Sequence, residues 1–226
     1  MHDWISRLFE NRDLVRMGHG QRAKDLNLGI GWIYYGLARA MRPRTAVVIG
    51  SYRGFVPLVL AKALADNLEG GEVVFIDPSL VDDFWKDADA VRAHFAGFGI
   101  TNIRHHLMTT QQFAVSQAYR DLAPVGMAFI DGHHTDEQAR FDFETFEPRL
   151  TPDGIALFHD TGHYRLSRMH GAERTYVHTV KDYVDSLKSR ADLQVFDVPF
   201  ADGVSLVRRT TAVPAEASGV GATANG

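Results

Sequence analysis

The chain has 226 residues, of which 45% are hydrophobic, 23% charged and 11% aromatic, a composition typical of an ordinary folded protein. Its 24 basic and 28 acidic residues give a net charge of -4, so no basic surface indicates nucleic acid or an anionic membrane as a partner. The lack of cysteine excludes disulfides, a thiolate nucleophile and sulfur-ligated zinc, so any metal must be held by oxygen or imidazole.

The first 44 residues are expected to form a helical cap region. Trp4–Phe9 and Leu26–Met41 have helical patterns and are expected to cover the cleft of the domain that follows. No apolar run reaches the roughly 18–20 residues that cross a bilayer, and Met1–Asn11 lacks the apolar segment of a signal peptide. We therefore expect a cytoplasmic protein without membrane insertion.

Over residues 45–210, short β-branched runs alternate with longer helical patterns, which is typical of βαβ units and a parallel sheet. The runs follow one another at intervals close to the roughly 30 residues that such a unit requires. Helices are expected over Phe55–Leu68, Asp136–Leu150 and Tyr176–Leu187, with a polar loop over 161–175. The five expected strands are Thr45–Ile49, Glu72–Asp77, Asn102–Leu107, Val125–Asp131 and Gly154–His159.

The end of this domain is expected to be antiparallel. Leu193–Phe200 and Gly203–Arg209 flank the short turn Ala201-Asp202-Gly203, a pattern that predicts a hairpin. Residues 211–226 show no periodicity and are expected to be a disordered tail. The predicted fold class is α/β, with a Rossmann-like, mostly parallel seven-stranded sheet, a C-terminal antiparallel hairpin and helices on both faces.

Two expected strand ends indicate a nucleoside site. The first strand runs into Gly50-Ser51-Tyr52-Arg53-Gly54, where glycines let the backbone approach a ligand, although a plain tight turn fits as well. Tyr52 occupies a position where the dinucleotide fingerprint GxGxxG needs glycine. Asp77, at the end of the second strand, can accept both hydroxyls of a ribose or simply form the turn before Pro78. Together the loop and Asp77 favour an adenosine-bearing cofactor.

Two further strand ends carry acids and imidazoles. Asp131 is followed closely by His133 and His134, and the fifth strand ends in His159 and Asp160. Neither motif contains a basic residue, so a divalent cation would neutralise the carboxylates. Carboxylates suit Mg²⁺ or Mn²⁺, and an added imidazole favours a transition metal. In the alternative interpretation the two aspartates cap the segments that follow them and the histidines are exposed.

The same segments resemble a known family. The run AVVIGSYRGFVPLVLA over residues 46–61 resembles the first motif of class I S-adenosylmethionine-dependent methyltransferases. FIDGHH and LTPDGIALFHD resemble the metal-dependent sugar O-methyltransferases of methyltransferase family 24, which include the macrocin and mycinamicin enzymes and cephalosporin hydroxylase-like proteins. The resemblance covers residues 45–209. It implies methyl transfer to a hydroxyl of a small molecule, with a saccharide as the expected acceptor.

The resemblance also implies a role for each matching residue. The methionine portion of the cofactor would be lined by Gly50, Ser51, Tyr52 and Gly54, its ribose would be held by Asp77, and its adenine would lie beside Met108 and Thr109. Asp131 would serve both the cofactor and a divalent metal, whose site His159 and Asp160 would complete. His134 would be the general base. Two departures from the family stand out: Val48 replaces an acid that usually contacts the amino group, and His159 replaces a usually acidic ligand. The expected metal is Mg²⁺, and His159 leaves Mn²⁺ or another transition metal open.

The sequence leaves other functions open. They are a nucleotide-linked oxidoreductase, a hydroxylase-like protein, and a non-methylating protein that binds S-adenosylmethionine. The missing GxGxxG motif argues against the oxidoreductase. The acceptor, the hydroxyl that is methylated and the oligomeric state, including a homo-oligomer, are also left open. No nucleic-acid partner is expected.

Overall fold

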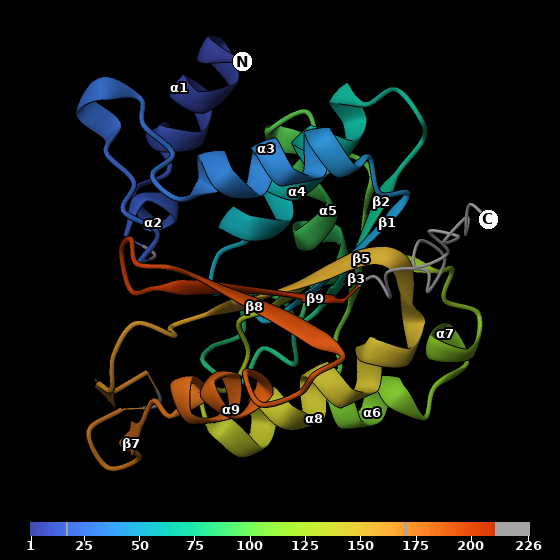
Figure 1. The fold of residues 1–226 in the computed structure, drawn as a ribbon. Coiled ribbons are helices and arrows are strands. Elements are labelled where there is room, and N and C mark those ends of the chain that lie inside the picture. The colour runs from blue at the N-terminus through green and yellow to red at the C-terminus, as the bar shows by residue number, and fades with distance from the viewer. Residues whose placement is uncertain (17, 170, 211–226) are drawn as a thin grey trace, which may run out of the picture.

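The computed structural model describes residues 1–16, 18–169 and 171–210, so the tail expected over residues 211–226 lies outside the described residues. Its centre is a seven-stranded sheet of order β3-β2-β1-β4-β5-β9-β8 (Figure 1). A separate two-stranded sheet pairs β6 with β7. The strands are β1 (Thr45–Ile49), β2 (Glu72–Ile76), β3 (Ile103–His106), β4 (Val125–Ile130), β5 (Leu150–His159), β6 (Leu166–Ser167), β7 (Tyr176–Val177), β8 (Leu193–Val198) and β9 (Val204–Arg209).

The direction of the strands confirms the expected α/β class. Neighbouring strands from β3 to β5 pair in parallel, whereas β9 is antiparallel to both β5 and β8. Strand β1 lies between β2 and β4, so the connections reverse direction beside it. Ligands of open α/β sheets bind outside the carboxyl ends of the strands at such a point.

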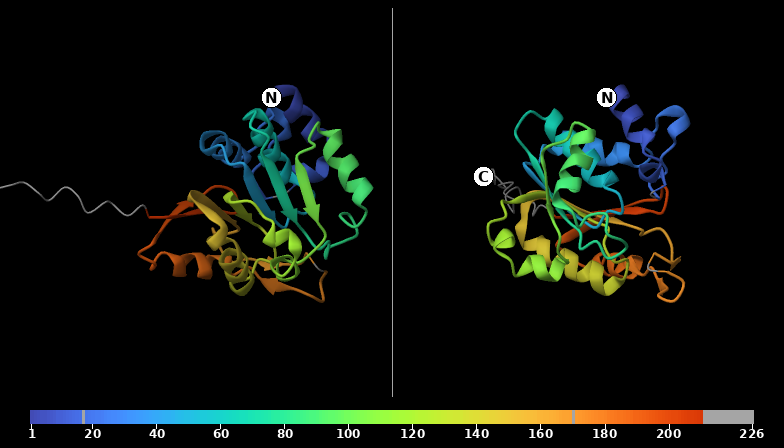
Figure 2. Two further views of the ribbon diagram at one scale, coloured as in Figure 1. Left: turned by 90° about the vertical axis from the view of Figure 1, so that its right-hand side faces the viewer. Right: turned by 180° about the vertical axis from the view of Figure 1, so that it is seen from behind.

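Helices cover both faces of the sheet (Figures 1 and 2). Along β1, Ala46 and Val48 belong to one apolar cluster and Val47 and Ile49 to the other, because successive side chains of a strand point to opposite faces. The first cluster packs against α1 (His2–Glu10), α2 (Arg12–Val15), α3 (Gly31–Met41), α4 (Phe55–Asp66) and α5 (Ala88–Gly97), and the second against α6 (Thr110–Ala114), α7 (Gln117–Arg120), α8 (Asp136–Phe146) and α9 (Val180–Leu187). Single 3-10 turns lie at η1 (Ala23–Asp25) and η2 (Glu147–Arg149).

Two expected helices begin later than predicted. The expected helix over Leu26–Met41 begins at Gly31, since Leu26 and Gly29 have positive φ and the Ile30 amide donates to the His19 carbonyl. The expected helix over Tyr176–Leu187 begins at Val180. Its first residues instead form β7, which pairs with β6 in the neighbouring loop. In both cases, backbone hydrogen bonds to another segment hold the expected first residues of the helix in a non-helical conformation.

The boundary between α8 and β5 also differs from the prediction. Helix α8 begins as expected at Asp136, and the Thr135 side chain caps it by accepting a hydrogen bond from the Gln138 amide. It ends at Phe146 and not at Leu150, because the next turn is a 3-10 turn that contains Pro148. Strand β5 then begins at Leu150, earlier than the expected start at Gly154.

Within the described part of the chain, no helix is both long enough and apolar enough to span a membrane.

Candidate active site

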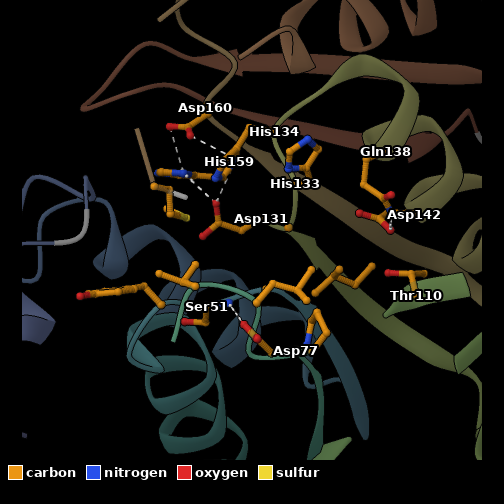
Figure 3. A pocket seen from close by; sticks show the side chains of 18 of the residues that line it. Ser51, Asp77, Thr110, Asp131, His133, His134, Gln138, Asp142, His159 and Asp160 are labelled. Atoms are coloured by element: carbon orange, nitrogen blue, oxygen red, sulfur yellow. Dashed lines mark hydrogen bonds and ion pairs between the residues drawn. The ribbon is translucent and has the colours of Figure 1, made fainter. Parts of the chain in front are cut away.

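A cavity of about 1000 Å³ lies at the carboxyl ends of β1, β2, β4 and β5 (Figure 3). Apart from Gly54, every site residue predicted from the sequence lines this cavity. The residues it brings together are Gly50, Ser51, Tyr52, Asp77, Met108, Thr109, Asp131, His134, His159 and Asp160.

The turn after β1 is held tightly against the turn after β4. Gly50 has a φ of 73°, and a Cβ atom at this position would lie only 2.3 Å from the Asp131 carbonyl oxygen. The Gly50 amide donates to the Ile76 carbonyl and the Asp131 amide to the Ile49 carbonyl, both at 2.9 Å. A glycine is therefore required for the ends of β1, β2 and β4 to meet at one edge of the cavity.

Gly54, which was predicted beside the cofactor, lies outside the cavity lining. It precedes α4 with a φ of 86°, and a Cβ atom there would lie 3.0 Å from the Phe95 ring and 3.1 Å from the Trp85 ring. Its amide donates to the Ser51 hydroxyl. Gly54 thus allows α4 to pack against the segment from Trp85 to α5, behind the wall of the cavity.

The Asp77 carboxylate is fixed by backbone amides. Its Oδ2 atom accepts a hydrogen bond of 3.0 Å from the Ser51 amide, and its Oδ1 atom accepts one of 2.7 Å from the Ser79 amide. Burial raises the pKa of Asp77 above its usual range, although both hydrogen bonds act in the opposite direction. Each carboxylate oxygen can accept two hydrogen bonds, and each accepts one here, so each retains one acceptor position for a ligand.

The loop after β3 forms the wall beside Asp77. Met108 lines the cavity and packs against the second apolar cluster. Thr109 lines it too, but its hydroxyl caps α6 by accepting from the Gln112 amide, while the Gln112 side chain accepts from the Thr109 amide. Tyr52 also lines the cavity, and the Arg53 guanidinium lies over its ring, 3.7 Å from the ring centroid.

Asp131, His159 and Asp160 converge at one end of the cavity (Figure 3). The Nδ1 atom of His159 lies 3.1 Å from Asp131 Oδ1 and 3.3 Å from Asp160 Oδ1. Burial acts to lower the pKa of His159, but the nearby carboxylates, Asp131 above all, outweigh it and raise the pKa to about 9. The two strand ends therefore meet at one place, with the His159 imidazole between the two carboxylates.

His134 lies on the other side of the Asp160 carboxylate. Its Nδ1 atom is 3.2 Å from Asp160 Oδ2, and its ring stacks on the His178 ring at 4.3 Å between centroids. Burial lowers the pKa of His134 to about 4, although Asp131 and Asp160 act against this change. The ring is therefore neutral at neutral pH, in the form that can accept a proton.

Sequence analysis missed two partners of Asp160. Arg165 Nη2 lies 2.8 Å and His178 Nδ1 2.9 Å from Asp160 Oδ2. Burial alone would raise the pKa of Asp160, but the hydrogen bond with His178 and the nearby His159 and Arg165 lower it. Arg165 was expected only in the polar loop, and His178 follows β7, so the fold alone reveals their pairing with a strand-end acid.

Three further histidines lie near the strand ends or the cavity. His133 and His163 are both exposed, but only His133 lines the cavity, with its ring 4.1 Å from the Tyr176 ring. His19, which no motif marks, stacks on Phe55 and lies 4.4 Å from His159 between ring centroids. The N-terminal segment therefore contributes one wall of the site.

The donor atoms fit a divalent cation. The ligand atoms of Asp131, His159 and Asp160 lie within 4.8 Å of one another, and those of His134, Asp160 and His178 form a second such group. Asp160 Oδ1 and His159 Nε2 are buried and have no hydrogen-bond partner within the described residues. Two carboxylates and an imidazole suit Mn²⁺ or a similar ion better than Mg²⁺, which prefers oxygen ligands.

Comparisons with known proteins agree with this geometry. A family model described as a methyltransferase domain matches residues 47–161, slightly more than half of the chain. The uncharacterized protein y4gI from Sinorhizobium fredii (strain NBRC 101917 / NGR234) is 28% identical over 147 residues, or 58% of this chain. The match spans only 15% of the length of that relative.

Solved structures share the fold. The O-methyltransferase TomG from Streptomyces achromogenes, in complex with SAM, has a TM-score of 0.62 and 17% identity over 92% of this chain and 89% of that one. SAH-bound PaMTH1 from Podospora anserina has a TM-score of 0.63 and 18% identity over 91% and 88% of the two chains. An O-methyltransferase from Bacillus cereus, in complex with SAH, has a TM-score of 0.61 and 14% identity over 93% and 92%. Identities this low establish the shared fold alone.

Proposed function

This chain belongs to the methyltransferase domain family, and we propose that it is an S-adenosylmethionine-dependent O-methyltransferase that acts on a small molecule. The proposed acceptor is a hydroxyl group of a saccharide, assisted by a divalent metal. The observation that carries the proposal is that Asp77 and the converging Asp131, His159 and Asp160 line one cavity at the carboxyl ends of the strands.

The cofactor is proposed to lie along the turns after β1 and β2. Asp77 would accept the ribose hydroxyls with the two acceptor positions that the Ser51 and Ser79 amides leave free. Gly50, which has no Cβ, would let the backbone approach the methionine portion, the role that the family resemblance implies. TomG and the Bacillus cereus enzyme, which share this fold, are complexes with SAM and SAH respectively, and this supports the same cofactor here.

Asp131, His159 and Asp160 are the proposed metal ligands. When bound there, a divalent ion lowers the pKa of a hydroxyl group that it coordinates, as it does for water. The buried Asp160 Oδ1 atom has no hydrogen-bond partner within the described residues, although it lies 3.3 Å from His159 Nδ1 in an ion pair, and this supports a further ligand at this point. The proposed position of the metal ion is beside Asp131, which lies on the turn that also contacts Gly50.

His134 is the proposed general base. Its Nδ1 atom faces Asp160 Oδ2 at 3.2 Å, so Nε2 is the nitrogen that would accept the hydroxyl proton of the acceptor. As the oxygen–carbon bond forms, the carbon–sulfur bond breaks and its electron pair stays on the sulfur. The nearby carboxylates of Asp131 and Asp160 would stabilise the imidazolium that results.

One observation favours a metal-free form of the same reaction. With a pKa of about 9, His159 is protonated at neutral pH in the absence of a metal, and its imidazolium lies between Asp131 and Asp160. In that form the histidine itself would neutralise the two carboxylates. Chelation of divalent metal separates the two forms.

The proposal is tested by mass spectrometry of a panel of mono- and disaccharides incubated with the chain, S-adenosylmethionine and Mn²⁺. We expect a product heavier by one methylene group, its loss on addition of EDTA and its return on addition of Mn²⁺ or Mg²⁺. Asp131→Asn should lower kcat by about 100-fold or more, since metal and cofactor both depend on this turn. Asp153→Asn, at an exposed position of β5, is the matched control and should leave the rate unchanged.

Other outcomes would each overturn a part of the proposal. Methylation that survives EDTA would exclude the metal and leave the His159 form. An unchanged rate in Asp131→Asn would contradict both forms, because His159 pairs with Asp131 in each proposal. Binding of S-adenosylmethionine without any methylated product across the panel would contradict saccharide methylation and favour a non-methylating module.

A further inference from the structure

The end of the cavity away from His159 and Asp160 holds a second buried carboxylate (Figure 3). Asp142 on α8 is only 1% exposed and lines the cavity together with Gln138 and Thr110. Its Oδ1 atom accepts a hydrogen bond of 2.7 Å from Gln138 Nε2. Its Oδ2 atom is buried and has no hydrogen-bond partner within the described residues.

Neighbouring amides fix the orientation of this carboxylate. Gln111 Nε2 donates to Gln138 Oε1 at 2.9 Å, so the amide nitrogen of Gln138 is directed toward Asp142. Gln138 and Asp142 are four residues apart on α8 and lie on the same face of the helix. This chain of hydrogen bonds holds Oδ1 in place and thereby sets the direction of Oδ2.

A glycine leaves room beside the free oxygen. A Cβ atom on Gly132 would lie 3.4 Å from Asp142 Oδ2 and 3.3 Å from Ile49 Cγ2. Gly132 directly follows Asp131, so the backbone here connects the proposed metal ligands with the Asp142 end of the cavity. The cavity is continuous between these two ends.

An unpaired buried carboxylate oxygen is unfavourable for the free protein. Burial raises the pKa of Asp142 to about 7, despite the opposing effects of Thr110 and Gln138. Neither of these groups is charged, so no cation of the described residues compensates for the carboxylate. A ligand that donates a hydrogen bond to Oδ2 would remove this penalty.

We propose that Asp142 Oδ2 accepts a hydrogen bond from the exocyclic amino group of the cofactor's adenine and so selects adenine over a 6-oxopurine. This inference rests on the proposed function, which places the ribose on Asp77. The base then extends along Met108 and Thr109 toward Thr110 and Asp142. In adenosine the amino group is the one hydrogen-bond donor of the base, since its free ring nitrogens are all acceptors. A carboxylate can therefore recognise this base only at that group.

Because the Oδ1 atom of Asp142 is fixed, one substitution should reverse the preference for adenine over a 6-oxopurine. In Asp142→Asn, the donor Gln138 Nε2 would retain the amide oxygen in the place of Oδ1. The amide nitrogen would then occupy the place of Oδ2, where it presents a donor to the cavity instead of an acceptor. That donor would repel the adenine amino group and pair with the oxygen of a 6-oxopurine.

The test is titration calorimetry of the full chain with S-adenosylhomocysteine and with S-inosylhomocysteine, its 6-oxopurine analogue. The wild-type chain should bind the inosyl compound about 10- to 100-fold more weakly, the effect expected for loss of a hydrogen bond to a charged acceptor. Asp142→Asn should reduce this ratio of Kd values by at least about tenfold. Glu137→Gln, an exposed change in the same helix, is the control and should leave the ratio unchanged.

The outcomes separate this inference from the function on which it rests. Equal binding of both compounds by the wild-type chain would overturn the inference, as would an unchanged ratio in Asp142→Asn. Binding of neither compound by the wild-type chain would instead contradict the proposed cofactor. The wild-type comparison requires no variant, so it decides the question even if Asp142→Asn folds poorly.

Discussion

The polar atoms that lack partners are concentrated at the site. Five buried side-chain atoms have no hydrogen-bond partner in the described residues; one, Asn67 Oδ1, lies at the end of α4. The other four are Asp142 Oδ2, Asp160 Oδ1 and the Nε2 atoms of His159 and His178. All four belong to residues that line the cavity or contact Asp160. Unpaired buried polar atoms are rare in folded proteins and reduce their stability. Their placement indicates that the free protein gives up stability to hold groups that a ligand will use.

Asp142→Asn should therefore stabilise the free chain, and more so at high pH. The pKa of Asp142 is about 7 in the folded chain against an ordinary value of 3.8, so the penalty grows as pH rises from about 4 and is complete above about 7. This difference in pKa corresponds to at most about 4 kcal/mol. We expect the variant to raise the free energy of unfolding by about 1–4 kcal/mol at pH 8 and by clearly less at pH 5, as measured by urea denaturation.

The control for this measurement is Glu137→Gln, which removes an exposed carboxylate from the same helix. Its effect should be small and similar at both pH values. A gain for Asp142→Asn that is equal at pH 5 and pH 8 would show that the carboxylate has an ordinary pKa in the folded chain.

The sequence predicted the site residues that directly follow strands and missed those that do not. Asp77, Asp131 and Asp160 end parallel strands, and such ends must lie at one edge of a sheet. Arg165 and His178 reach Asp160 from a loop whose path depends on the pairing of β6 with β7. No local pattern specifies that pairing, so these two partners could not be deduced.

At the scale of elements, the close contact between the turns after β1 and β4 determines the shape of the cavity. It depends on Gly50, whose positive φ and lack of Cβ let the backbone approach the Asp131 carbonyl oxygen. The sequence suggested close approach of backbone to a ligand at this glycine. The structure shows that the backbone at Gly50 approaches a neighbouring strand end.

Gly50→Ala should lower the free energy of unfolding by about 3 kcal/mol or more, because its Cβ would combine a clash with an unfavourable φ. Gly36→Ala is the matched control, since Gly36 is exposed within α3 and nothing lies within 4 Å of its Cβ position. That change should stabilise the chain by about 0.5–1 kcal/mol. Urea denaturation of both variants checks the signs, and equal effects would contradict the role given to Gly50.

Strand positions were predicted more accurately than helix ends. Strand β1 matches its prediction at both ends, because fully buried parallel strands appear as short continuous apolar runs. The helix that precedes it begins five residues late, since its expected first turn is bound to His19. Pro148 shortens α8 for a local reason, because proline cannot continue the helical hydrogen bonding. The late start of α3 follows instead from contacts with another segment, which periodicity does not record.

At the scale of the whole molecule, the site joins segments from both halves of the chain. The sheet brings the ends of β1, β2, β4 and β5 together, and the N-terminal segment adds His19 against His159. The loop that carries Arg165 covers the same end of the cavity. The proposed cofactor and metal sites thus depend on the complete packing of sheet, cap and loop, and no single motif contains them.

The most direct test of the central claim is an anomalous difference map from crystals grown with Mn²⁺ and S-adenosylhomocysteine. We predict a manganese peak among Asp131, His159 and Asp160, with the ribose on Asp77. A map with the nucleoside bound but no peak there, and with His159 still ion-paired to both carboxylates, would contradict metal-assisted methyl transfer. So would a peak confined to the group of His134, Asp160 and His178.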